Sequence, residues 1–411
     1  MRFGHSQLRE RLRALPRLGR LVPALEGLAP TYLVGGAVRD LLRGEPAVDL
    51  DVAMEGDAVL AAQELAARLG GRAVRHERFG TATVIVGDLT LDLAQTRRER
   101  YELPGALPAV TPAPLEADLA RRDFAINAMA VALSGDALGR LHDPLGGVED
   151  LDRGIVRVLH EQSFVDDPTR LLRAVRYETR LDFALEADTE RLAREAAQAG
   201  ALATVSGARV RDELLALLAE EAAPRAVARL RSLGLDRALD PALATDAELV
   251  ASAQLGALET GAERALTGLA ALLAPDALAL TLFLDRLALP ATRRDAVARA
   301  AGGAATIARR LRSQAVRPSD LYDLLRGEPP EALALALALG APPAPILDWS
   351  AHLRHVRLEI TGDDLIAAGL QPSPAFGRAL EETLRRRLDG ELEGRDAELA
   401  AALEVLREGE G

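Results

Sequence analysis

Hydrophobic and polar positions follow two different periods along the chain and divide it into a mixed first third and a helical remainder. Residues 57–69 have the spacing of an amphipathic helix, whereas residues 81–86 and 89–93 predict two strands joined by Gly87-Asp88, a two-residue hairpin turn. From Phe164 onward the apolar spacing is helical, which predicts a string of helices. The helical pattern is interrupted near residues 198–206, 236–244, 271–276, 313–319, 327–331 and 340–346.

A short predicted strand carries two carboxylates, Asp49 and Asp51. Alternate side chains of a strand share a face, so both carboxylates point the same way while Val48, Leu50 and Val52 point into the core. Carboxylate oxygens are the ligands that a hard divalent cation prefers. A solvated strand end is the alternative, but the glycine turn that precedes this strand favours a metal site.

That glycine turn lies in LVGGAVRD, where Gly35 and Gly36 precede a predicted helix. Free backbone N–H groups at such a turn bind phosphate oxygens. The alternative is an ordinary strand-to-helix turn, and the two interpretations are compatible. Arg39 either grips a phosphate or braces the turn.

The second strand of the predicted hairpin offers a further carboxylate. Thr90 and Asp92 fall on the face opposite Leu91 and Leu93. Two alternatives remain open for Asp92: a third carboxylate near the metal, or an exposed hairpin residue.

The segment RRDFAINAMA, residues 121–130, begins with charged residues and then turns apolar. Arg121, Arg122, Asp123 and Asn127 supply hydrogen-bonding groups suited to ribose hydroxyls and phosphate. The alternative is a capped helix start, with Asp123 as the N-cap.

The segment VDDPTRLLRAVRYETRLDF predicts a helix that begins at Asp167-Pro168, a good N-cap and first-turn pair. At about 100° per residue its arginines share one sector of roughly 120°. Like charges on one strip repel each other unless an anion neutralises them, so a triphosphate or a nucleic-acid backbone is favoured over a solvated arginine face. These arginines are Arg170, Arg173, Arg176 and Arg180.

Residues 95–114 contain too many helix and strand breakers for regular structure, and we expect a long functional loop there. The loop has a basic stem, with Arg97, Arg98 and Arg100. Its breakers are Pro104, Gly105, Pro108, Pro112 and Pro114.

Composition narrows the classes of protein. A chain of 411 residues with 49% hydrophobic content can form two to four structural units. Cysteine is absent, which excludes disulfides, thiolate zinc sites and thiol nucleophiles. The formal charge is −12, yet all 50 basic residues are arginine, which suits local phosphate and base contacts. Without lysine there is no Walker-type phosphate loop.

Other classes are disfavoured by the arrangement of particular residues. No apolar run has the length of a membrane span, so no membrane association is expected. The arginine-rich residues 1–21 include Glu10, and we expect a surface helix there, not a transit peptide, and a cytoplasmic protein. His142-Asp143 lies in a turn-like stretch without a second histidine cluster, which argues against a metal-dependent phosphohydrolase domain.

Three segments together resemble a known family. GGAVRDLLRGEPAVDLDV, RRDFAINAMA and DDPTRLLRAVRYETRLDF are similar to successive motifs of the class II tRNA nucleotidyltransferases, which include bacterial poly(A) polymerases. The resemblance implies an α+β, polymerase-beta-like catalytic head over residues 1–135. All-helical parts would follow in an elongated chain: a base-reading neck over 136–205, a body over 206–345 and a tRNA-binding tail over 346–411.

The resemblance also implies roles for individual residues. Asp49 and Asp51 would bind Mg²⁺, Asp167 and Arg170 would read the incoming base, and the remaining positions would contact the nucleotide. Those positions are Gly35, Gly36, Arg39, Arg122, Asp123, Asn127, Arg173 and Arg176.

Two positions depart from the family pattern. Asp166 stands where glutamate is usual, which puts the role of Asp166 in doubt. In SGARVRDELLALL, Arg209 and Glu213 fit a further helix motif of the family, but Ala208 replaces an acidic residue.

The implied function is template-independent addition of C, A or both to the 3′ end of tRNA from CTP and ATP, with release of pyrophosphate. Poly(A) synthesis, transfer to a small molecule or protein, and non-catalytic binding of RNA or nucleotide are the alternatives. In this family, enzymes that add only CC lack a flexible loop between the first two motifs. Residues 95–114 fill that place, which favours an enzyme able to add the terminal A.

Overall fold

The structure, a computed structural model, describes residues 4–45, 50–76, 80–87, 89–273, 277–313 and 316–408. Val48 and Asp49 therefore lie outside the described residues. The backbone divides into two compact units. Unit 1 is Met1–Leu217 with Arg229–Pro241, and unit 2 is Leu218–Ala228 with Ala242–Gly411. The expected division into head, neck, body and tail is finer and stays a prediction.

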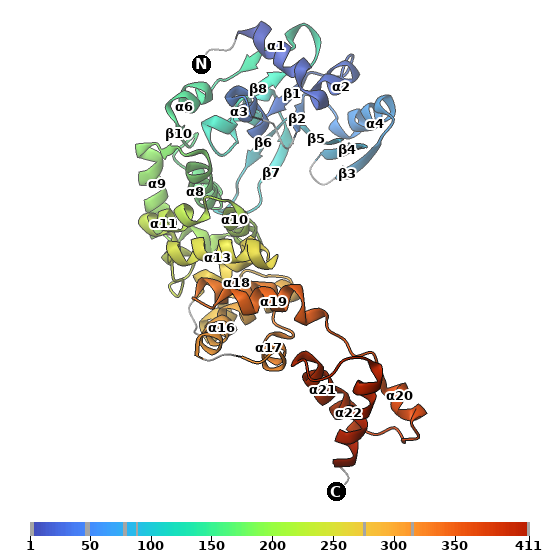
Figure 1. The fold of residues 1–411 in the computed structure, drawn as a ribbon. Helices are drawn as coiled ribbons and strands as arrows, with labels where there is room; N and C mark the ends of the chain where they lie inside the picture. Colours follow the sequence, from blue (N-terminus) through green and yellow to red (C-terminus); the bar gives the residue numbers. More distant parts are fainter. Residues whose placement is uncertain are drawn as a thin grey trace. The chain divides into compact units, whose positions relative to one another are not determined.

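Unit 1 is built around a mixed seven-stranded sheet of order β3-β4-β5-β2-β1-β8-β9 (Figure 1). The pair β2–β5 is parallel and the other neighbours are antiparallel, so the expected hairpin of β4 and β5 is confirmed. The strands are β1 (Thr31–Val34), β2 (Asp51–Met54), β3 (Arg72–His76), β4 (Thr81–Val86), β5 (Leu89–Gln95), β8 (Ala130–Ala132) and β9 (Leu141–His142).

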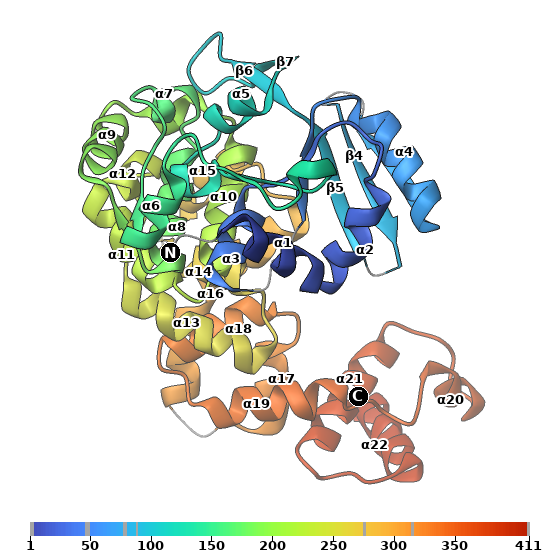
Figure 2. The same ribbon diagram turned by 90° about the horizontal axis from the view of Figure 1, so that it is seen from above.

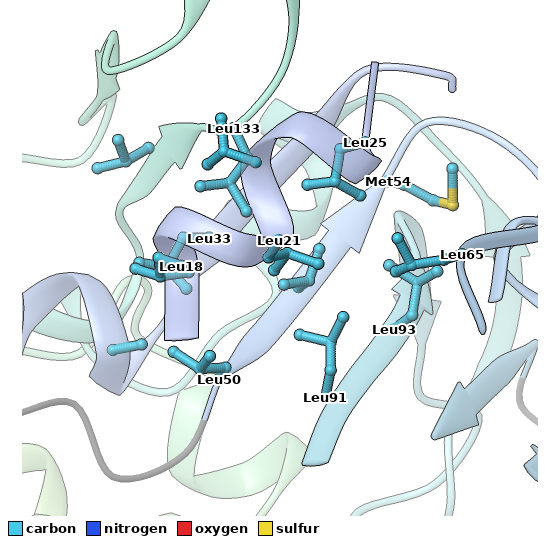
Figure 3. Packing of buried hydrophobic residues seen from close by; sticks show 14 of the residues in the cluster. Leu18, Leu21, Leu25, Leu33, Leu50, Met54, Leu65, Leu91, Leu93 and Leu133 are labelled. Carbon is cyan, nitrogen blue, oxygen red and sulfur yellow. The ribbon is translucent and has the colours of Figure 1, made fainter. Parts of the chain in front are cut away.

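One face of the sheet carries the main apolar core of unit 1 (Figure 3). Alternation along β2 and β5 directs Leu50, Val52, Leu91 and Leu93 to this face. Helices α1 (His5–Ala14) and α2 (Pro16–Ala24) and helix α4 (Ala58–Leu69) contribute further leucines to the core. The described part of the arginine-rich stretch is thus helical, and its leucines pack into the core.

The opposite face of the sheet is polar where β2 and β5 meet. Asp51 lies next to Asp92 in the parallel register, and both are exposed. Ala53, further along β2, belongs to a smaller apolar cluster on this face. The prediction that the carboxylates face away from the main core is confirmed for Asp51 and Asp92.

Residues 95–114 are more regular than expected. They contain an antiparallel hairpin of β6 (Arg97–Arg100) and β7 (Ala109–Pro112), in which Arg97 pairs with Pro112. A two-stranded ribbon tolerates the prolines because proline is compatible with an edge strand, where its missing N–H removes no ladder bond. The expectation of a loop without regular structure was therefore wrong for the two arms.

The remainder of unit 1 is mainly helical. Its helices are α3 (Gly36–Arg43), α5 (Leu115–Ala120), α6 (Gly147–Arg153), α7 (Ser163–Asp166), α8 (Arg170–Leu181), α9 (Ala187–Gln198) and α12 (Leu235–Leu239), with the 3₁₀ turns η2 (Ala125–Asn127), η3 (Gly135–Ala137) and η4 (Ala201–Thr204). Two short strands, β10 (Ile155–Val156) and β11 (Ala184–Leu185), pair in parallel. Helices α10 (Gly207–Ala219) and α11 (Ala223–Leu233) cross the boundary between the units.

Unit 2 is built from helices, as the periodicity predicts (Figure 1). Helix α18 packs against α13, α14 and α16, and its residues Ala332 to Ala336 are buried. The helices of unit 2 are α13 (Ala247–Thr260), α14 (Arg264–Leu272), α15 (Ala277–Arg286), α16 (Ala291–Ser313), α17 (Pro318–Leu325), α18 (Pro330–Ala338), α19 (Pro343–Ala351), α20 (Gly362–Ala367), α21 (Ala375–Leu388) and α22 (Arg395–Glu408), with the 3₁₀ turn η5 (Leu353–His355). Within the described ranges, no helix is long and apolar enough to cross a membrane.

Helix α4 allows a matched test of the core, because it packs against β3 and β4 and has one face in solvent. Figure 2 shows α4 beside β4. Leu65 is 0% exposed and Leu60 is 63% exposed. We expect Leu65→Ala to lower the free energy of unfolding by about 2–5 kcal/mol, and Leu60→Ala to change it by less than about 0.5 kcal/mol. Urea unfolding of both variants checks this, and equal losses would contradict the assigned packing.

Candidate active site

A cavity of about 500 Å³ in unit 1 gathers most of the predicted site residues. Its walls come from the β1–α3 turn, the start of β2, the β6 arm, the segment around η2, and helices α8 and α10. The lining residues are Gly35, Gly36, Asp51, Glu99, Tyr101, Arg121, Arg122, Asp123, Asn127, Asp167, Thr169, Arg170, Arg173, Tyr177, Arg209, Asp212 and Glu213. The predicted residues Arg39, Arg176 and Asp92 do not line it, and Asp49 lies outside the described residues.

Gly35 brings an arginine and a carboxylate close to the backbone of the glycine turn. Its φ of 71° and ψ of −139° lie in a region that favours glycine. A Cβ atom at this position would lie 2.9 Å from Nη1 of Arg122 and 3.8 Å from Oδ2 of Asp51. The turn therefore needs glycine for its conformation, and a Cβ atom there would displace the end of the Arg122 side chain.

Arg39 is buried, with only 2% of the residue exposed. Its Nη1 donates to Oδ1 of Asn127 at 2.8 Å, and its Nε donates to Oδ1 of Asp40 at 2.9 Å. These contacts join α3 to η2, and Arg39 does not line the cavity. Which of the two roles considered for Arg39 applies stays a prediction.

Asp123 is the centre of a buried polar network. One carboxylate oxygen accepts from the Phe124 N–H at 2.8 Å and from the Asn127 amide at 3.1 Å. The other oxygen accepts from Nε of Arg173 at 2.9 Å, while Nη1 of Arg173 donates to Glu213 at 3.1 Å. The network thus joins the RRD segment to α8 and α10. Asp123 does not cap an α-helix, because only the 3₁₀ turn η2 follows it.

Burial alone would raise the pKa of Asp123, but the charge and hydrogen bonds of Arg173 outweigh it. The Asn127 amide and the charge of Arg170 act in the same direction, so the pKa of Asp123 is lowered from its ordinary value. The Asp123 carboxylate in turn raises the pKa of Arg173 well above its ordinary value. Both groups are therefore charged at neutral pH.

The arginine face of α8 is largely neutralised by the chain itself. Glu213 pairs with both Arg173 and Arg176, at 3.1 and 3.2 Å. The expectation that an external anion must neutralise this face is therefore corrected for these two arginines. Both arginines are paired with carboxylates, and of the two only Arg173 lines the cavity.

Asp167 and Arg170, the predicted base-reading pair, both line the cavity but bind different partners. Oδ1 of Asp167 accepts from the Thr169 N–H at 3.1 Å and from the Thr169 hydroxyl at 2.6 Å. Helix α8 begins at Arg170 with Thr169 at its N-cap, so these bonds stabilise the turn before the helix and the expected N-cap at Asp167 is corrected. The Arg170 side chain is buried and donates to Ser163 Oγ at 2.7 Å and to the Arg121 carbonyl at 2.8 Å.

Sequence analysis missed the part that the β6 arm contributes to the cavity. Glu99 accepts from Arg121 at 2.7 Å and from the Tyr101 hydroxyl at 3.0 Å. Burial, with the charge of Glu99, raises the pKa of Tyr101 to about 12. If residues 97–101 had been interpreted as a strand, the two-residue spacing of Glu99 and Tyr101 would have placed them on one side.

Tyr177 and Asp212 were missed as well. Tyr177 follows Arg173 by one helical turn, a spacing that could have been detected. The Tyr177 ring has the guanidinium groups of Arg39 and Arg176 at 5.4 and 5.3 Å from its centroid. Asp212 lies in SGARVRDELLALL, the segment that resembles a further helix motif, but only Arg209 and Glu213 were singled out there.

Of the carboxylates considered for a divalent metal, the structure describes Asp51 and Asp92. Asp51 presents an exposed carboxylate to the cavity beside the glycine turn, which is compatible with a hard cation. Oδ1 of Asp92 accepts from the Thr83 hydroxyl at 2.7 Å, so one oxygen of this carboxylate is already hydrogen-bonded within the sheet. Among the described residues there is no group of three metal-type side chains, and Asp49 is not among them.

Comparison with known proteins extends this picture. The model of the poly A polymerase head domain matches residues 31–157. A second model, of a probable RNA and SrmB-binding site of polymerase A, matches residues 182–246. A CC-adding tRNA nucleotidyltransferase of Deinococcus radiodurans is 35% identical over 371 residues, which cover 90% of this chain and 87% of the relative. The chain belongs to the tRNA nucleotidyltransferase family.

Solved structures of this family share the fold along the whole chain. A CCA-adding enzyme in complex with CTP matches with a TM-score of 0.80 and 30% identity, covering 99% of this chain and 100% of that one. The Thermotoga maritima CCA-adding enzyme complexed with tRNA matches with a TM-score of 0.76 and 30% identity, covering 97% and 98%. The expected α+β head followed by helices is confirmed.

The alignments to A-adding relatives cover only part of those relatives. The A-adding tRNA nucleotidyltransferase of Geobacter sulfurreducens is 36% identical over 414 residues, which cover 94% of this chain but 46% of the relative. That of Halalkalibacterium halodurans is 43% identical over 240 residues, or 58% of this chain and 56% of the relative. The chain thus spans about half the length of these two relatives.

The Asp123 network predicts a pH-dependent loss of stability. Because the pKa of Asp123 is lowered from 3.8 in the folded state, its contribution is present above pH 3.8 and declines as the pH falls through the lowered pKa. We expect Asp123→Asn to lower the free energy of unfolding at pH 7 by on the order of 3 kcal/mol, because it leaves Arg173 without its main partner.

Urea unfolding between pH 7 and pH 3 measures this difference. The gap between wild type and Asp123→Asn should narrow toward the acid end. A gap that widens toward acid would contradict the assigned charge state of Asp123.

Proposed function

We propose that this chain adds the terminal A to tRNA ending in CC, from ATP and with release of pyrophosphate, without a nucleic-acid template. One observation carries the proposal: a single cavity brings Asp51, the Gly35 turn, Asp167 and Arg170 together. A metal-type carboxylate, a phosphate-binding turn and a base-reading pair are the parts that such a reaction needs.

The reaction is displacement at the α-phosphate of ATP by the 3′-hydroxyl of the RNA. We propose that Asp49 and Asp51 hold Mg²⁺, which when bound supplies charge neutralisation for the triphosphate and lowers the pKa of the attacking hydroxyl. The backbone of Gly35 and Gly36 and the side chain of Arg122 contact the phosphates. Arg122 is positioned for this by Asp118, which accepts from its Nη2 at 3.0 Å.

Base choice comes from Asp167 and Arg170. The Watson–Crick edge of adenine offers an amine donor beside a ring-nitrogen acceptor, and cytosine offers the same order. A carboxylate that accepts from the amine and a guanidinium that donates to the ring nitrogen match both bases. Guanine and uracil present the reverse order, so they leave buried groups unpaired, a loss of about 1–3 kcal/mol for each group.

One observation favours addition of A. Residues 95–114 form a hairpin where CC-only relatives are expected to lack a loop. Over alignments that span most of this chain, an A-adding relative is 36% identical and a CC-adding relative 35%, so identity does not separate the two activities. The CC-adding relative aligns along 87% of its own length, so CC addition is the second candidate.

One assay separates these candidates. Purified chain is given tRNA that ends at the discriminator base, after C or after CC, with either CTP or ATP. We expect extension by one residue only for tRNA ending in CC with ATP. Extension of the shorter tRNAs by CTP alone would identify a CC-adding enzyme, and a long adenylate tail would identify a poly(A) polymerase.

The metal assignment predicts a catalytic loss without loss of fold. Asp51→Ala should reduce nucleotide transfer by at least about a thousandfold while the thermal melting curve is unchanged, because an exposed carboxylate contributes little stability. Asp136→Ala, at an exposed carboxylate of the same unit, is the matched control. Near-normal transfer by Asp51→Ala at saturating Mg²⁺ would show that the assignment is wrong.

The base-reading assignment predicts a change of selectivity. Asp167→Asn keeps an oxygen for Thr169 but can turn an amide donor toward the base. The use of GTP relative to ATP should then rise about tenfold or more, since guanine has a carbonyl where adenine has an amine. Competition assays on tRNA ending in CC measure the ratio. An unchanged ratio with normal thermal stability would show that Asp167 serves only the turn before α8.

A further inference from the structure

The hairpin of β6 and β7 forms a two-stranded sheet of its own, separate from the seven-stranded sheet (Figure 2). Residues that pair across an antiparallel ribbon lie on the same face, and successive residues of one strand alternate between the faces. One face carries Glu99, which lines the cavity, and we call it the inner face. The opposite face is the outer face of the hairpin, and it consists of Arg98, Arg100, Ala109 and Thr111.

The outer face is open to solvent. All four of its residues are exposed, whereas Arg97, Glu99 and Val110 of the inner face are partly buried. The rest of unit 1 therefore contacts the inner side of the hairpin, and the outer side is available to a partner.

The two arginines of the outer face lack an internal counter-charge. On the inner face, Glu99 pairs with Arg97 at 3.1 Å and with Arg121 at 2.7 Å. In the ranges that the structure describes, no carboxylate pairs with Arg98 or Arg100, and the outer face itself contains none. Two cations on alternate residues of a strand, about 7 Å apart, repel each other, and an external anion removes this repulsion.

The spacing and the neighbours of these arginines suit an extended polyanion. The distance between alternate residues of a strand is comparable with that between successive phosphates of a single RNA strand. Ala109 and Thr111 are small, so a sugar-phosphate backbone can approach the ribbon closely, and the Thr111 hydroxyl is a further donor. Arginine is also the side chain that binds a phosphate with two parallel hydrogen bonds.

The charge of the whole chain makes such a local cationic face necessary for a polyanionic substrate. The net charge is −12, so the molecule as a whole repels RNA, and RNA is held only where cations are concentrated. On its inner side the same hairpin places Glu99, and Tyr101 directly after β6, in the wall of the cavity. The outer face is thus one ribbon away from the cavity.

We propose that the outer face of the hairpin binds the sugar-phosphate backbone of the RNA substrate at its acceptor end. Arg98 and Arg100 contact successive phosphates while the 3′ end lies in the cavity on the inner side. These contacts position the RNA and carry no base selection. The inference rests on the proposed function, because that function makes RNA the substrate.

Binding is measured without nucleotide transfer, as the affinity of the full chain for tRNA ending in CC at a series of KCl concentrations. The double variant Arg98→Gln/Arg100→Gln should bind about tenfold more weakly at about 0.1 M salt. The slope of log K against log salt concentration should become shallower by about 1.4–2, since each lost phosphate contact accounts for about 0.7–1.

Arg13→Gln/Arg20→Gln is the matched control, because it removes the same charge from two exposed arginines of α1 and α2. Its affinity and salt slope should stay close to those of wild type. In transfer assays, the outer-face variant should raise the KM for tRNA, while kcat at saturating tRNA and the KM for ATP change less than about twofold. An outer-face variant that binds like wild type, or a control that loses as much, would overturn the inference.

The place of the contact on the RNA is tested with a single thiol. The chain contains no cysteine, so Thr111→Cys introduces a unique site on the outer face for a benzophenone maleimide label. Light should cross-link this label to the acceptor end of the tRNA, whereas a label on Ser6→Cys, at an exposed position of α1, should not reach it. Cross-links confined to the anticodon arm, or none with tRNA that is bound, would overturn the inference.

Failure of this inference is distinct from failure of the proposed function. A wild-type chain that binds tRNA through Arg98 and Arg100 but transfers no nucleotide would overturn the proposed function and leave the outer-face contact in place. A chain that adds A normally in the outer-face variant, with unchanged affinity for tRNA, would do the reverse.

Discussion

The ion pair between Asp123 and Arg173 is the constraint on which the rest of the cavity depends. Asp123 is only 7% exposed and lies in the segment that follows α5, whereas Arg173 lies on α8. A buried carboxylate is tolerated only when its charge and hydrogen bonds are satisfied. Four donors satisfy Asp123, and they come from η2, its flanking backbone and α8. Residues near the sheet and residues of the helices therefore line the same cavity.

From this pair the contacts extend in both directions. Asn127 connects Asp123 to Arg39 and hence to the glycine turn, and Glu213 connects Arg173 to α10. Arginines that would repel one another are thereby held by carboxylates before any ligand binds. A pre-organised site of this kind would not need to reorganise its charges on binding the triphosphate that we propose as its substrate.

Predictions from the sequence were correct where the spacing of residues within one strand or helix decides which face they share. The alternation in β2 and β5 placed Asp51 and Asp92 on one face, and the helical spacing placed the arginines of α8 together. It failed where partners are remote: Arg39 and Asn127 are 88 residues apart, and Asp123 and Arg173 are 50 apart. No pattern within one element indicates that Arg39 binds Asn127, or that Glu213 pairs with two arginines of α8. The hairpin arms were missed because prolines at an edge strand resemble loop breakers.

The central claim is that the Asp123–Arg173 pair shapes the nucleotide site, and a double-mutant cycle on ATP affinity tests it most directly. Asp123→Asn, Arg173→Gln and the double variant are titrated with ATP in a calorimeter, in the absence of tRNA. Each single variant should weaken binding by about tenfold, and the double variant should bind no more weakly than either single one. If the two losses multiply in the double variant, or if both single variants bind ATP like wild type, the pair does not shape the site and the account is wrong.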